Sequence, residues 1–334
     1  MRDFNSNQSS GSPLLNVRNV SIAFDTEKGR FNAVDDVSFQ VRSGSTHAIV
    51  GESGCGKSVT ALATMGLLPD LGRVVQGSIL FQGKNVLDFT EAELERLRGN
   101  DIAMVFQEPM TALNPVYTVG QQISEVFRIH QKLGRKEAKE AAIQMIKKVR
   151  IPDPEKRYDE YPFQLSGGMR QRILVAIALS CDPKLLIADE PTTALDVTIQ
   201  LQILNLMKEL QQDMGTAIIL ITHDLGVVAE MADDVTVMYA GKVIESGSVF
   251  DVFQNPTHPY TRGLLNSIPK ITDDKGTKLS TIKGLVPSIF NQPKGCRFNN
   301  RCDIAIPLCQ KAVPELKPIS GSHRAACFRM QEGK

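Results

Sequence analysis

The sequence contains, at positions 51–58, the stretch Gly51-Glu52-Ser53-Gly54-Cys55-Gly56-Lys57-Ser58, which fits the pattern G-x-x-x-x-G-K-[ST]. The apolar run 46–50 before it predicts a buried strand, and residues 58–67 after it predict a helix. Here the glycines let successive backbone N–H groups point at phosphate oxygens, and the helix N-terminus adds partial positive charge. We therefore expect this loop and Val59 to surround the phosphates of a nucleoside triphosphate, with Lys57 reaching the β- and γ-phosphates and Ser58 binding Mg²⁺.

Two acidic residues follow a second apolar run. Residues 185–190 read Leu-Leu-Ile-Ala-Asp-Glu, so Asp189 and Glu190 stand at the end of a predicted strand. Asp189 is placed to hold Mg²⁺, directly or through water, and Glu190 is placed to polarise an attacking water molecule. The alternative is a surface acid pair after a core strand, but the loop at 51–58 favours phosphoryl transfer to water.

The remaining patterns predict an α/β protein. Residues 15–24 and 33–41 alternate apolar and polar side chains, which indicates half-buried antiparallel strands. Residues 119–150 and 167–180 have helical periodicity, and two buried strands flank an amphipathic helix within 185–222, which indicates a parallel βαβ unit. Further strands are expected at 77–81, 84–86, 102–106, 235–239 and 242–246.

Composition and charge exclude several classes of protein. Of 334 residues, 42% are hydrophobic and 22% are charged, which is typical of a folded globular chain. The 38 basic and 37 acidic residues give a net charge of 38 − 37 = +1, so no broad positive field favours nucleic acid. No apolar run approaches the roughly 18–20 residues that cross a bilayer. The polar start MRDFNSNQSSGSP has no signal-peptide core, so we expect residues 1–13 to be a disordered tail and the chain to stay in the cytoplasm.

A third stretch carries a family resemblance. Residues 165–172 read Leu-Ser-Gly-Gly-Met-Arg-Gln-Arg, which resembles the signature sequence of the ATP-binding-cassette (ABC) ATPases. In that family two cassettes sandwich two nucleotides head to tail. A serine and two glycines at a helix N-terminus can also cradle an anion. The resemblance implies that the residues facing a partner's ATP are Ser166, Gly167, Gly168 and Gln171.

Other positions match the same family one by one. Gln107, after the strand expected at 102–106, resembles the Q-loop glutamine, which would touch Mg²⁺ or the water. Asp196 resembles the D-loop aspartate at the dimer seam, and His223 resembles the switch histidine that contacts the γ-phosphate. The resemblance thus implies Glu190, His223 and Gln107 as catalytic residues, and Ser58, Gln107 and Asp189 as Mg²⁺ ligands.

An aromatic side chain is expected to stack on the adenine. Phe24 resembles the family's stacking residue. Residues 27–30 look inserted between it and the next strand, so Phe31 is a competitor, and Phe24 is favoured.

The resemblance also implies the architecture. Residues 14–255 would form the nucleotide-binding domain, a RecA-like P-loop ATPase core with an antiparallel β subdomain and an inserted α-helical subdomain at about 115–180. Residues 256–334 would form a small C-terminal extension that contains a cysteine cluster.

Several stretches resemble the ATPases of dipeptide and oligopeptide importers, namely 51–58, 106–115, 255–261 and 284–288. Within that family the chain looks like the D-type ATPase, which pairs with a related F-type subunit. The resemblance implies two membrane permeases, an extracytoplasmic peptide-binding protein and a peripheral position on the cytoplasmic face of the cell (inner) membrane. Importers of glutathione and other small substrates use similar subunits, so the cargo stays open.

Four of the six cysteines crowd into one region, at Cys296, Cys302, Cys309 and Cys327. In a reducing cytoplasm they need an explanation other than disulfides, and four thiolates can hold a [4Fe–4S] cluster or one Zn²⁺. The lack of C-x-x-C pairs weakens the zinc-finger interpretation. Related D-type ATPases carry an iron–sulfur centre, so the resemblance implies a [4Fe–4S] cluster. A zinc site and unliganded thiols are the alternatives.

Two functions outside transport compete with this hypothesis. A soluble cassette protein acting on ribosomes or DNA usually has two cassettes or a coiled-coil insertion, whereas this sequence shows one cassette and no heptad run. A regulatory protein whose cassette only binds ATP would not need Glu190 and His223. We therefore expect ATP and Mg²⁺ as the nucleotide and its metal, and no nucleic-acid partner.

Overall fold

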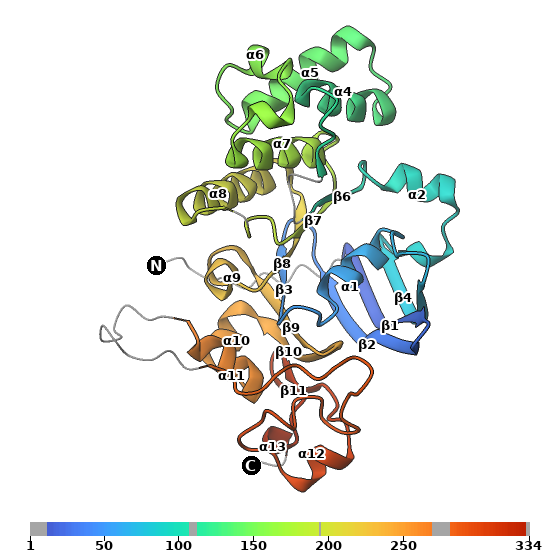
Figure 1. Ribbon diagram of the computed structural model, residues 1–334, viewed down its shortest axis with the longest axis vertical. Coiled ribbons are helices and arrows are strands. Elements are labelled where there is room, and N and C mark those ends of the chain that lie inside the picture. The colour runs from blue at the N-terminus through green and yellow to red at the C-terminus, as the bar shows by residue number, and fades with distance from the viewer. Residues whose placement is uncertain (1–11, 107–111, 194, 269–280, 332–334) are drawn as a thin grey trace.

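The computed structural model describes residues 12–106, 112–193, 195–268 and 281–331. Figure 1 shows helices α4 to α7 at one end of the molecule, two sheets in the middle and the C-terminal elements at the other end. The expected α/β class is confirmed. Within the described ranges, no helix is both long enough and apolar enough to cross a membrane.

The smaller sheet is antiparallel and has the strand order β2-β1-β4-β5. Its strands are β1 Leu15–Thr26, β2 Gly29–Val41, β4 Gly72–Phe81 and β5 Lys84–Asn85. Phe24 lies opposite Phe31 in register, and Thr26 lies opposite Gly29. Residues 27–30, which look inserted in the sequence, are therefore the tight end of a β-hairpin.

The larger sheet has the strand order β11-β12-β10-β9-β3-β8-β7-β6. Its strands are β3 Thr46–Val50, β6 Ile102–Val105, β7 Leu185–Asp189, β8 Ala217–Thr222, β9 Asp234–Tyr239, β10 Lys242–Ser248, β11 Lys317–Ser320 and β12 His323–Ala325. The run from β9 to β6 is parallel, and β10, β12 and β11 are added antiparallel. The sequence patterns do not predict β11 and β12, because strands this short show no periodicity.

Helices cover the larger sheet and build the helical end of the molecule. Their bounds are α1 Lys57–Thr64, α2 Glu91–Leu97, α4 Val119–His130, α5 Arg135–Lys148, α6 Pro154–Tyr158, α7 Gly167–Leu179, α8 Val197–Met214, α9 Leu225–Met231, α10 Val249–Gln254, α11 Pro259–Asn266, α12 Pro307–Lys311 and α13 Phe328–Gln331, with 3-10 turns at Val86–Asp88 and Pro162–Gln164. Helices α4 to α7 come from the segment in which the sequence predicts a helical block.

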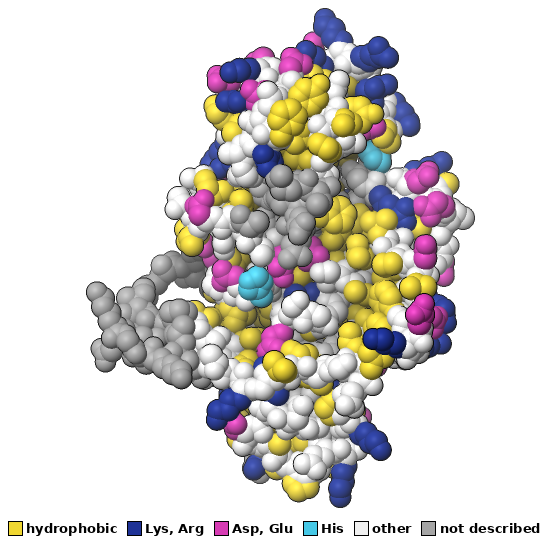
Figure 2. All heavy atoms as spheres, in the orientation of Figure 1, with side chains coloured by type: hydrophobic (Ala, Val, Ile, Leu, Met, Phe, Trp, Pro, Cys, Tyr) yellow, Lys and Arg dark blue, Asp and Glu magenta, His cyan; other side chains and the backbone are white. Residues whose placement is uncertain are grey.

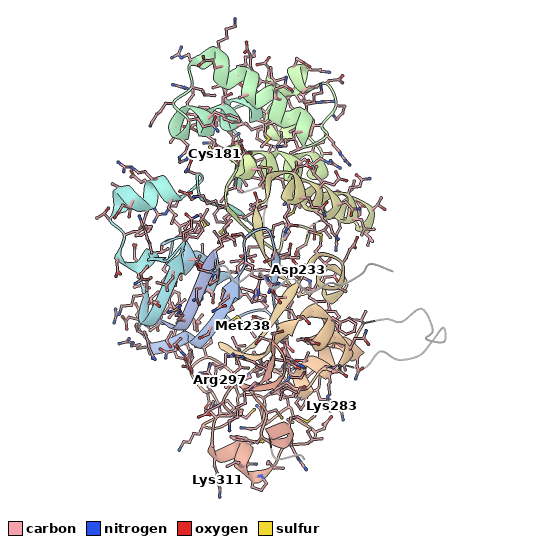
Figure 3. All side chains as sticks on the ribbon, turned by 180° about the vertical axis from the view of Figure 1, so that it is seen from behind. Cys181, Asp233, Met238, Lys283, Arg297 and Lys311 are labelled. Atoms are coloured by element: carbon pink, nitrogen blue, oxygen red, sulfur yellow. The ribbon has the colours of Figure 1, made fainter. Side chains whose placement is uncertain are left out.

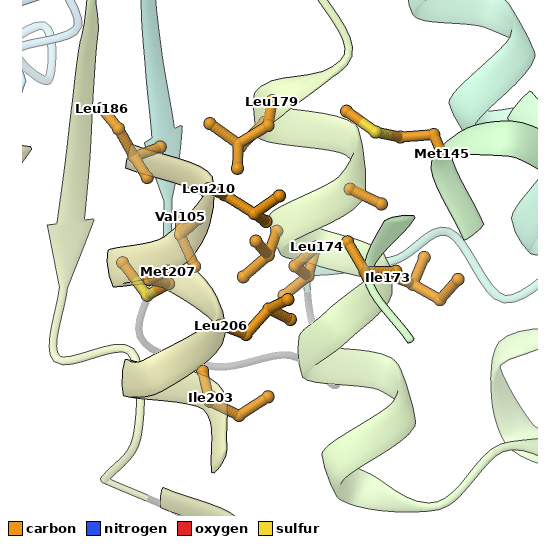
Figure 4. Close-up of a cluster of buried hydrophobic side chains, with 14 of the residues drawn as sticks. Val105, Met145, Ile173, Leu174, Leu179, Leu186, Ile203, Leu206, Met207 and Leu210 are labelled. Atoms are coloured by element: carbon orange, nitrogen blue, oxygen red, sulfur yellow. The ribbon is translucent and has the colours of Figure 1, made fainter. Parts of the chain in front are cut away.

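The central strands of the larger sheet are buried on both faces. Successive side chains of a strand point to opposite faces, so each strand contributes to two separate clusters. Leu186 and Ala188 of β7 pack with Ile173 of α7 and with α8, in the cluster drawn in Figure 4. Leu185 and Ile187 pack on the other face, in a cluster with α1 and the smaller sheet. A helical layer and a second sheet therefore hold the strand ends in place.

The C-terminal extension packs against the β9–β10 side of the larger sheet. Phe298 joins a buried cluster with Tyr239 of β9 and Tyr260 of α11. Arg297, labelled in Figure 3, pairs with Asp35 of β2. The extension is thereby attached to both sheets of the cassette.

Candidate nucleotide site

The candidate site lies at the carboxyl ends of three neighbouring parallel strands. Strand β8 is hydrogen-bonded to β3 on one side and to β7 on the other. The phosphate loop, residues 51–58, follows β3, while Asp189 ends β7 and His223 follows β8. Because the carboxyl ends of parallel strands meet at one edge of the sheet, segments far apart in the sequence come together here.

A cleft of about 620 Å³ opens at this edge. It is bounded by the phosphate loop, the β1–β2 hairpin, the ends of β7 and β8, and the C-terminal extension. Its lining residues are Phe24, Phe31, Ala33, Ser53, Gly54, Gly56, Lys57, Ser58, Val59, Glu190, His223 and Ile289. The cleft thus brings together most of the residues that the sequence predicts for the nucleotide, and it adds Ile289, which the sequence analysis missed.

Two glycines of the phosphate loop stand where a side chain would collide with backbone. A Cβ on Gly51 would lie 2.2 Å from the Met238 carbonyl oxygen. Gly56 has φ +99°, and a Cβ there would lie 2.8 Å from the Ala33 carbonyl oxygen. These close approaches fix the path of the loop between β9 and β2. Cys55 is buried, which raises the pKa of its thiol and keeps it neutral.

The Lys57 ammonium points back into the phosphate loop. Its Nζ donates hydrogen bonds to the carbonyl oxygens of Gly51 at 2.8 Å and Glu52 at 3.2 Å. The residue is buried, so its positive charge is fixed within the loop. A fixed charge of this kind can stabilise a bound phosphate without reorganising first.

Asp189 offers a coordination position beside the loop. Its Oδ1 atom is buried and has no hydrogen-bond partner among the described residues, while Ser58 hydrogen-bonds its side chain. Burial is the main cause that raises the pKa of Asp189, and the Glu190 charge adds to the rise. A buried carboxylate oxygen without a partner, next to a hydroxyl group, suits a hard cation with oxygen ligands. Ser58 and Asp189 therefore fit Mg²⁺.

Glu190 and His223 form a pair at the edge of the cleft. The Nδ1 atom of His223 lies 3.4 Å from Oε1 of Glu190, and the Thr193 hydroxyl donates to Oε2 at 2.9 Å. Glu190 has φ +47°, a conformation that is uncommon for a non-glycine residue and costs it about 1–3 kcal/mol. The sequence analysis singled out Glu190 and His223 but missed Thr193, which helps to orient the carboxylate.

Both candidate stacking residues line the cleft. The rings of Phe24 and Phe31 stack with centroids 5.7 Å apart. Phe290 of the extension meets Phe31 edge-on at 5.1 Å. The two rings therefore belong to one aromatic surface, and the preference for Phe24 stays a prediction.

The signature residues lie outside this cleft, at the start of α7. Ser166 caps the helix by accepting a hydrogen bond from the Met169 amide at 3.3 Å. Gly168 packs against α8, since a Cβ there would lie 2.8 Å from Cγ2 of Ile199. Gln171 is 1% exposed, and neither polar atom of its amide is hydrogen-bonded within the described residues. A contact between Gln171 and a partner's nucleotide would require this side chain to leave the interior.

Two further predicted residues have different outcomes. Asp196 caps α8 by accepting hydrogen bonds from the amides of Thr198 at 3.1 Å and Ile199 at 3.0 Å, a structural role that the sequence analysis missed. Gln107 lies outside the described residues.

The four C-terminal cysteines line one small cavity. Cys296, Cys302, Cys309 and Cys327 converge there, beside Phe298. Burial raises the pKa of Cys296 to about 11, and the other three thiols add to the rise. In the described parts of the chain, no three His, Cys, Asp or Glu side chains are arranged to hold a metal ion. The convergence expected from the sequence is therefore present, but the site shown is not a formed metal centre.

Two family models match the chain. The model of the ABC transporter family matches residues 34–193, which include the phosphate loop, the signature residues and the Asp189–Glu190 pair. The model of the oligopeptide/dipeptide transporter C-terminal region matches residues 244–309.

Several curated relatives are similar over nearly the whole chain. The oligopeptide transport ATP-binding protein AppD of Bacillus subtilis is 51% identical, with 96% of this chain and 98% of the relative covered. The dipeptide transport ATP-binding protein DppD of the same organism is 50% identical, with 94% of each chain covered. The oligopeptide transport ATP-binding protein OppD of Salmonella typhimurium is 49% identical, with 96% of this chain and 94% of the relative covered.

Solved structures of ATP-binding cassettes share the fold. An ATP-binding cassette solved as a dimer in a post-hydrolysis state with ADP and phosphate has a TM-score of 0.63 at 24% identity, and covers 70% of this chain and 98% of its own. The cbiO1 subunit of a Clostridium perfringens ABC transporter complex has a TM-score of 0.62 at 30% identity, covering 73% and 92%. The nucleotide cleft, the two family models and these relatives agree. The chain therefore belongs to the family of ABC transporter ATP-binding proteins, among those that carry the oligopeptide/dipeptide transporter C-terminal region.

Proposed function

We propose that this chain hydrolyses ATP to energise the import of dipeptides or oligopeptides. The observation that carries the proposal is the cleft in which Lys57 and Ser58 face Glu190 and His223, in a chain that also has the oligopeptide/dipeptide C-terminal region. The relatives named for peptide import cover both parts. ATP and Mg²⁺ are the nucleotide and metal of this family.

The residues around the cleft divide the chemistry between them. The phosphate loop binds the phosphates, and Ser58 and Asp189 hold the Mg²⁺ that neutralises their charge, with Gln107 as a further ligand. Glu190, oriented by Thr193, accepts a hydrogen bond from the attacking water and so polarises it. His223, 3.4 Å from Glu190, is within reach of the same reacting group. The aromatic surface of Phe24 and Phe31 takes the adenine.

A second cassette would complete the reaction. Ser166, Gly167 and Gly168 stand at the N-terminus of α7 and do not line this chain's own cleft, which supports contact with a partner's nucleotide. A solved cassette of the same fold is a dimer. The proposed partner is an F-type ABC ATPase, with Asp196 near the seam.

The membrane partners would be two permeases, served by an extracytoplasmic peptide-binding protein. On the face drawn in Figure 2, hydrophobic side chains gather over the helical end of the molecule. The exposed apolar residues of that region include Val116, Tyr117, Tyr161 and Phe163. An exposed apolar surface of this kind favours contact with another protein, and we assign it to a permease on the cytoplasmic face of the membrane.

We propose a division of the chain into three parts. In this division residues 1–13 would be a tail, of which 1–11 lie outside the described residues, 14–255 would be the nucleotide-binding domain with its helical subdomain at about 115–180, and 256–334 would be the extension. Helices α4 to α7 fall within the helical subdomain, and α11 begins the extension.

The experiment that tests this function is purification of the complex from native membranes. We expect the chain to co-purify with two permeases and a second cassette, and its ATPase rate in proteoliposomes to rise when a peptide-loaded binding protein is added. Stimulation by glutathione and not by longer peptides would reassign the cargo. Recovery with ribosomes or DNA, without permeases, would replace transport by the soluble-cassette hypothesis.

The cysteine cavity is proposed to hold a [4Fe–4S] cluster. Four thiols line one cavity, and thiolates are the ligands of such clusters. The lack of C-x-x-C pairs among them is the reason for proposing this cluster and not a zinc-finger site. When bound, the cluster would tie four separate segments of the extension together.

The cluster is tested by anaerobic purification. We expect brown protein with broad absorbance near ~400 nm and about four irons per chain. Replacement of Cys302 by Ser should abolish the absorbance, whereas Cys181→Ser, outside the cavity, should not. Stoichiometric zinc would make the site structural zinc, and a metal-free protein with four freely alkylated thiols would leave unliganded cysteines.

A further inference from the structure

The second residue of the phosphate loop is held by the C-terminal extension. Oε2 of Glu52 accepts a hydrogen bond from Nη1 of Arg301 at 2.9 Å. The Arg301 side chain is 5% exposed and that of Glu52 is 28% exposed, so this ion pair is largely withdrawn from solvent. The two residues are 249 positions apart in the sequence.

Arg301 is itself fixed in place by its surroundings. Its Nε donates to the Lys283 carbonyl oxygen at 3.0 Å, and Nη1 also contacts the Tyr239 hydroxyl at 3.3 Å. The guanidinium lies over the rings of Tyr239 at 5.7 Å and Phe298 at 5.8 Å. A planar group held on several sides loses little freedom when it binds a carboxylate, so Arg301 can act as a rigid anchor.

A second contact from the extension reaches the backbone of the same residue. The amide N–H of Glu52 donates to the Tyr260 hydroxyl at 2.9 Å. Tyr260 is fully buried and its ring packs against Tyr239 with centroids 4.8 Å apart. The side chain and the backbone of Glu52 are therefore both held, at the start of the phosphate loop.

Glu52 belongs to the phosphate loop and directly precedes Ser53, which lines the cleft, although its own carboxylate faces Arg301. An uncompensated carboxylate in the phosphate loop would repel the phosphates of ATP. Arg301 neutralises this charge and also orders the loop, and an ordered loop loses less conformational entropy when it binds ATP.

We propose that Arg301 is a positioning residue for ATP, which makes the C-terminal extension a working part of the nucleotide site. The inference rests on the proposed ATPase function and goes beyond it, because it assigns a nucleotide-binding task to a residue outside the cassette. Arg301 acts through Glu52 and does not itself touch the nucleotide.

The test is equilibrium binding of Mg²⁺-ATP to the full chain, with three variants. We expect Arg301→Gln to weaken binding by about five- to ten-fold, because it leaves the Glu52 charge uncompensated. Glu52→Gln alone should weaken binding by only about two-fold, and the double variant should bind like Glu52→Gln. The loss in Arg301→Gln should shrink in about 0.5 M salt, which screens the repulsion.

Arg297→Gln is the matched control. Arg297 is also in the extension, and its hydrogen bonds go to Asp35 and to the Ala240 carbonyl oxygen of the cassette, not to Glu52. Its variant should lower thermal stability and leave the affinity for ATP within about two-fold of wild type. A merely structural role for Arg301 would give equal affinity losses in the two variants, or no rescue in the double variant, and would overturn the proposal. If the wild-type chain itself binds no ATP, the proposed function fails instead.

Discussion

The Glu190 carboxylate is held by its strained backbone and by Thr193, and it lies 3.4 Å from His223. We predict that Glu190→Gln keeps ATP binding but lowers hydrolysis by at least about 100-fold, because an amide fits the same space but cannot polarise water. The measurement is phosphate release together with nucleotide affinity in the assembled complex. Thr193→Val should cost less, since it disturbs orientation only, and a near-normal rate in Glu190→Gln would place the catalytic carboxylate elsewhere.

The burial of His47 makes the stability of the protein depend on pH in the acid range. It is buried in β3 with Nε2 2.9 Å from the Thr236 hydroxyl, and burial lowers its pKa to about 4. The pKa of histidine in the unfolded chain is about 6.5. Below this pH the unfolded chain takes up a proton that folded His47 does not, so the free energy of unfolding falls as the pH drops from about 6.5 toward 4. Between these pH values His47→Gln should lose about 3 kcal/mol less free energy of unfolding than wild type, as measured by urea unfolding at several pH values.

His258 is a second group of the same kind, because burial lowers its pKa to about 3. The variant His47→Gln should therefore flatten only part of the acid dependence. Parallel stability curves for wild type and variant between pH 6.5 and 4 would show that His47 is not the titrating group.

At the residue scale, the sequence predicts the site residues that lie in a recognisable local motif after a strand. It does not predict the site residues whose role depends on contacts with distant parts of the chain. Glu190 and Lys57 stand in local patterns that can be recognised without coordinates. Thr193, Ile289 and Arg301 carry no such pattern, because what they contact is set by how the chain folds back on itself.

At the scale of elements, the contact between α7 and α8 depends on one glycine. A Cβ on Gly168 would lie 2.8 Å from Ile199, whereas a Cβ on Gly167 would meet Leu195 at 3.8 Å, an ordinary contact. We predict that Gly168→Ala destabilises the protein by about 1–3 kcal/mol and that Gly167→Ala has little effect. Thermal unfolding measures both.

The cause can be checked by making room on α8. Ile199→Ala removes the colliding methyl group, so the loss in the double variant should be smaller than the sum of the two single losses. Simple additivity would show that Gly168 does not act through Ile199.

The elements of the cassette could be predicted because their patterns are long. The strands around β3, β7 and β8 are continuous apolar runs, and α8 has a regular amphipathic repeat. Strands β11 and β12 could not, since they are short and β11 is exposed along its whole length. Pairing supplies the order that their own residues lack, since β12 is hydrogen-bonded to β10 and β11 to β12.

At the scale of the whole molecule, a buried contact between a histidine and a glutamate joins the extension to the cassette. His323 of β12 lies 2.8 Å from Glu245 of β10, and both are almost completely buried. We predict that His323→Ala costs about 1–3 kcal/mol, because it removes one contact of the buried Glu245 carboxylate, which keeps the hydrogen bonds from the amides of Thr257 and His258. Denaturant unfolding of the full chain measures the loss.

The neighbouring residue provides the control for this prediction. Arg324 lies in the same strand and is exposed, so Arg324→Ala should change stability by less than about 0.5 kcal/mol. Equal losses in the two variants would mean that β12 contributes through its backbone alone.

The ion pair between Arg301 and Glu52 has a consequence for hybrid proteins. A chimera that joins this cassette to the C-terminal region of a relative would take residue 52 from one parent and residue 301 from the other. A mismatched pair would leave one buried charge facing a neutral or like-charged group, even if both parents fold well alone. The two positions should therefore be exchanged together, and in natural relatives they should change together or not at all.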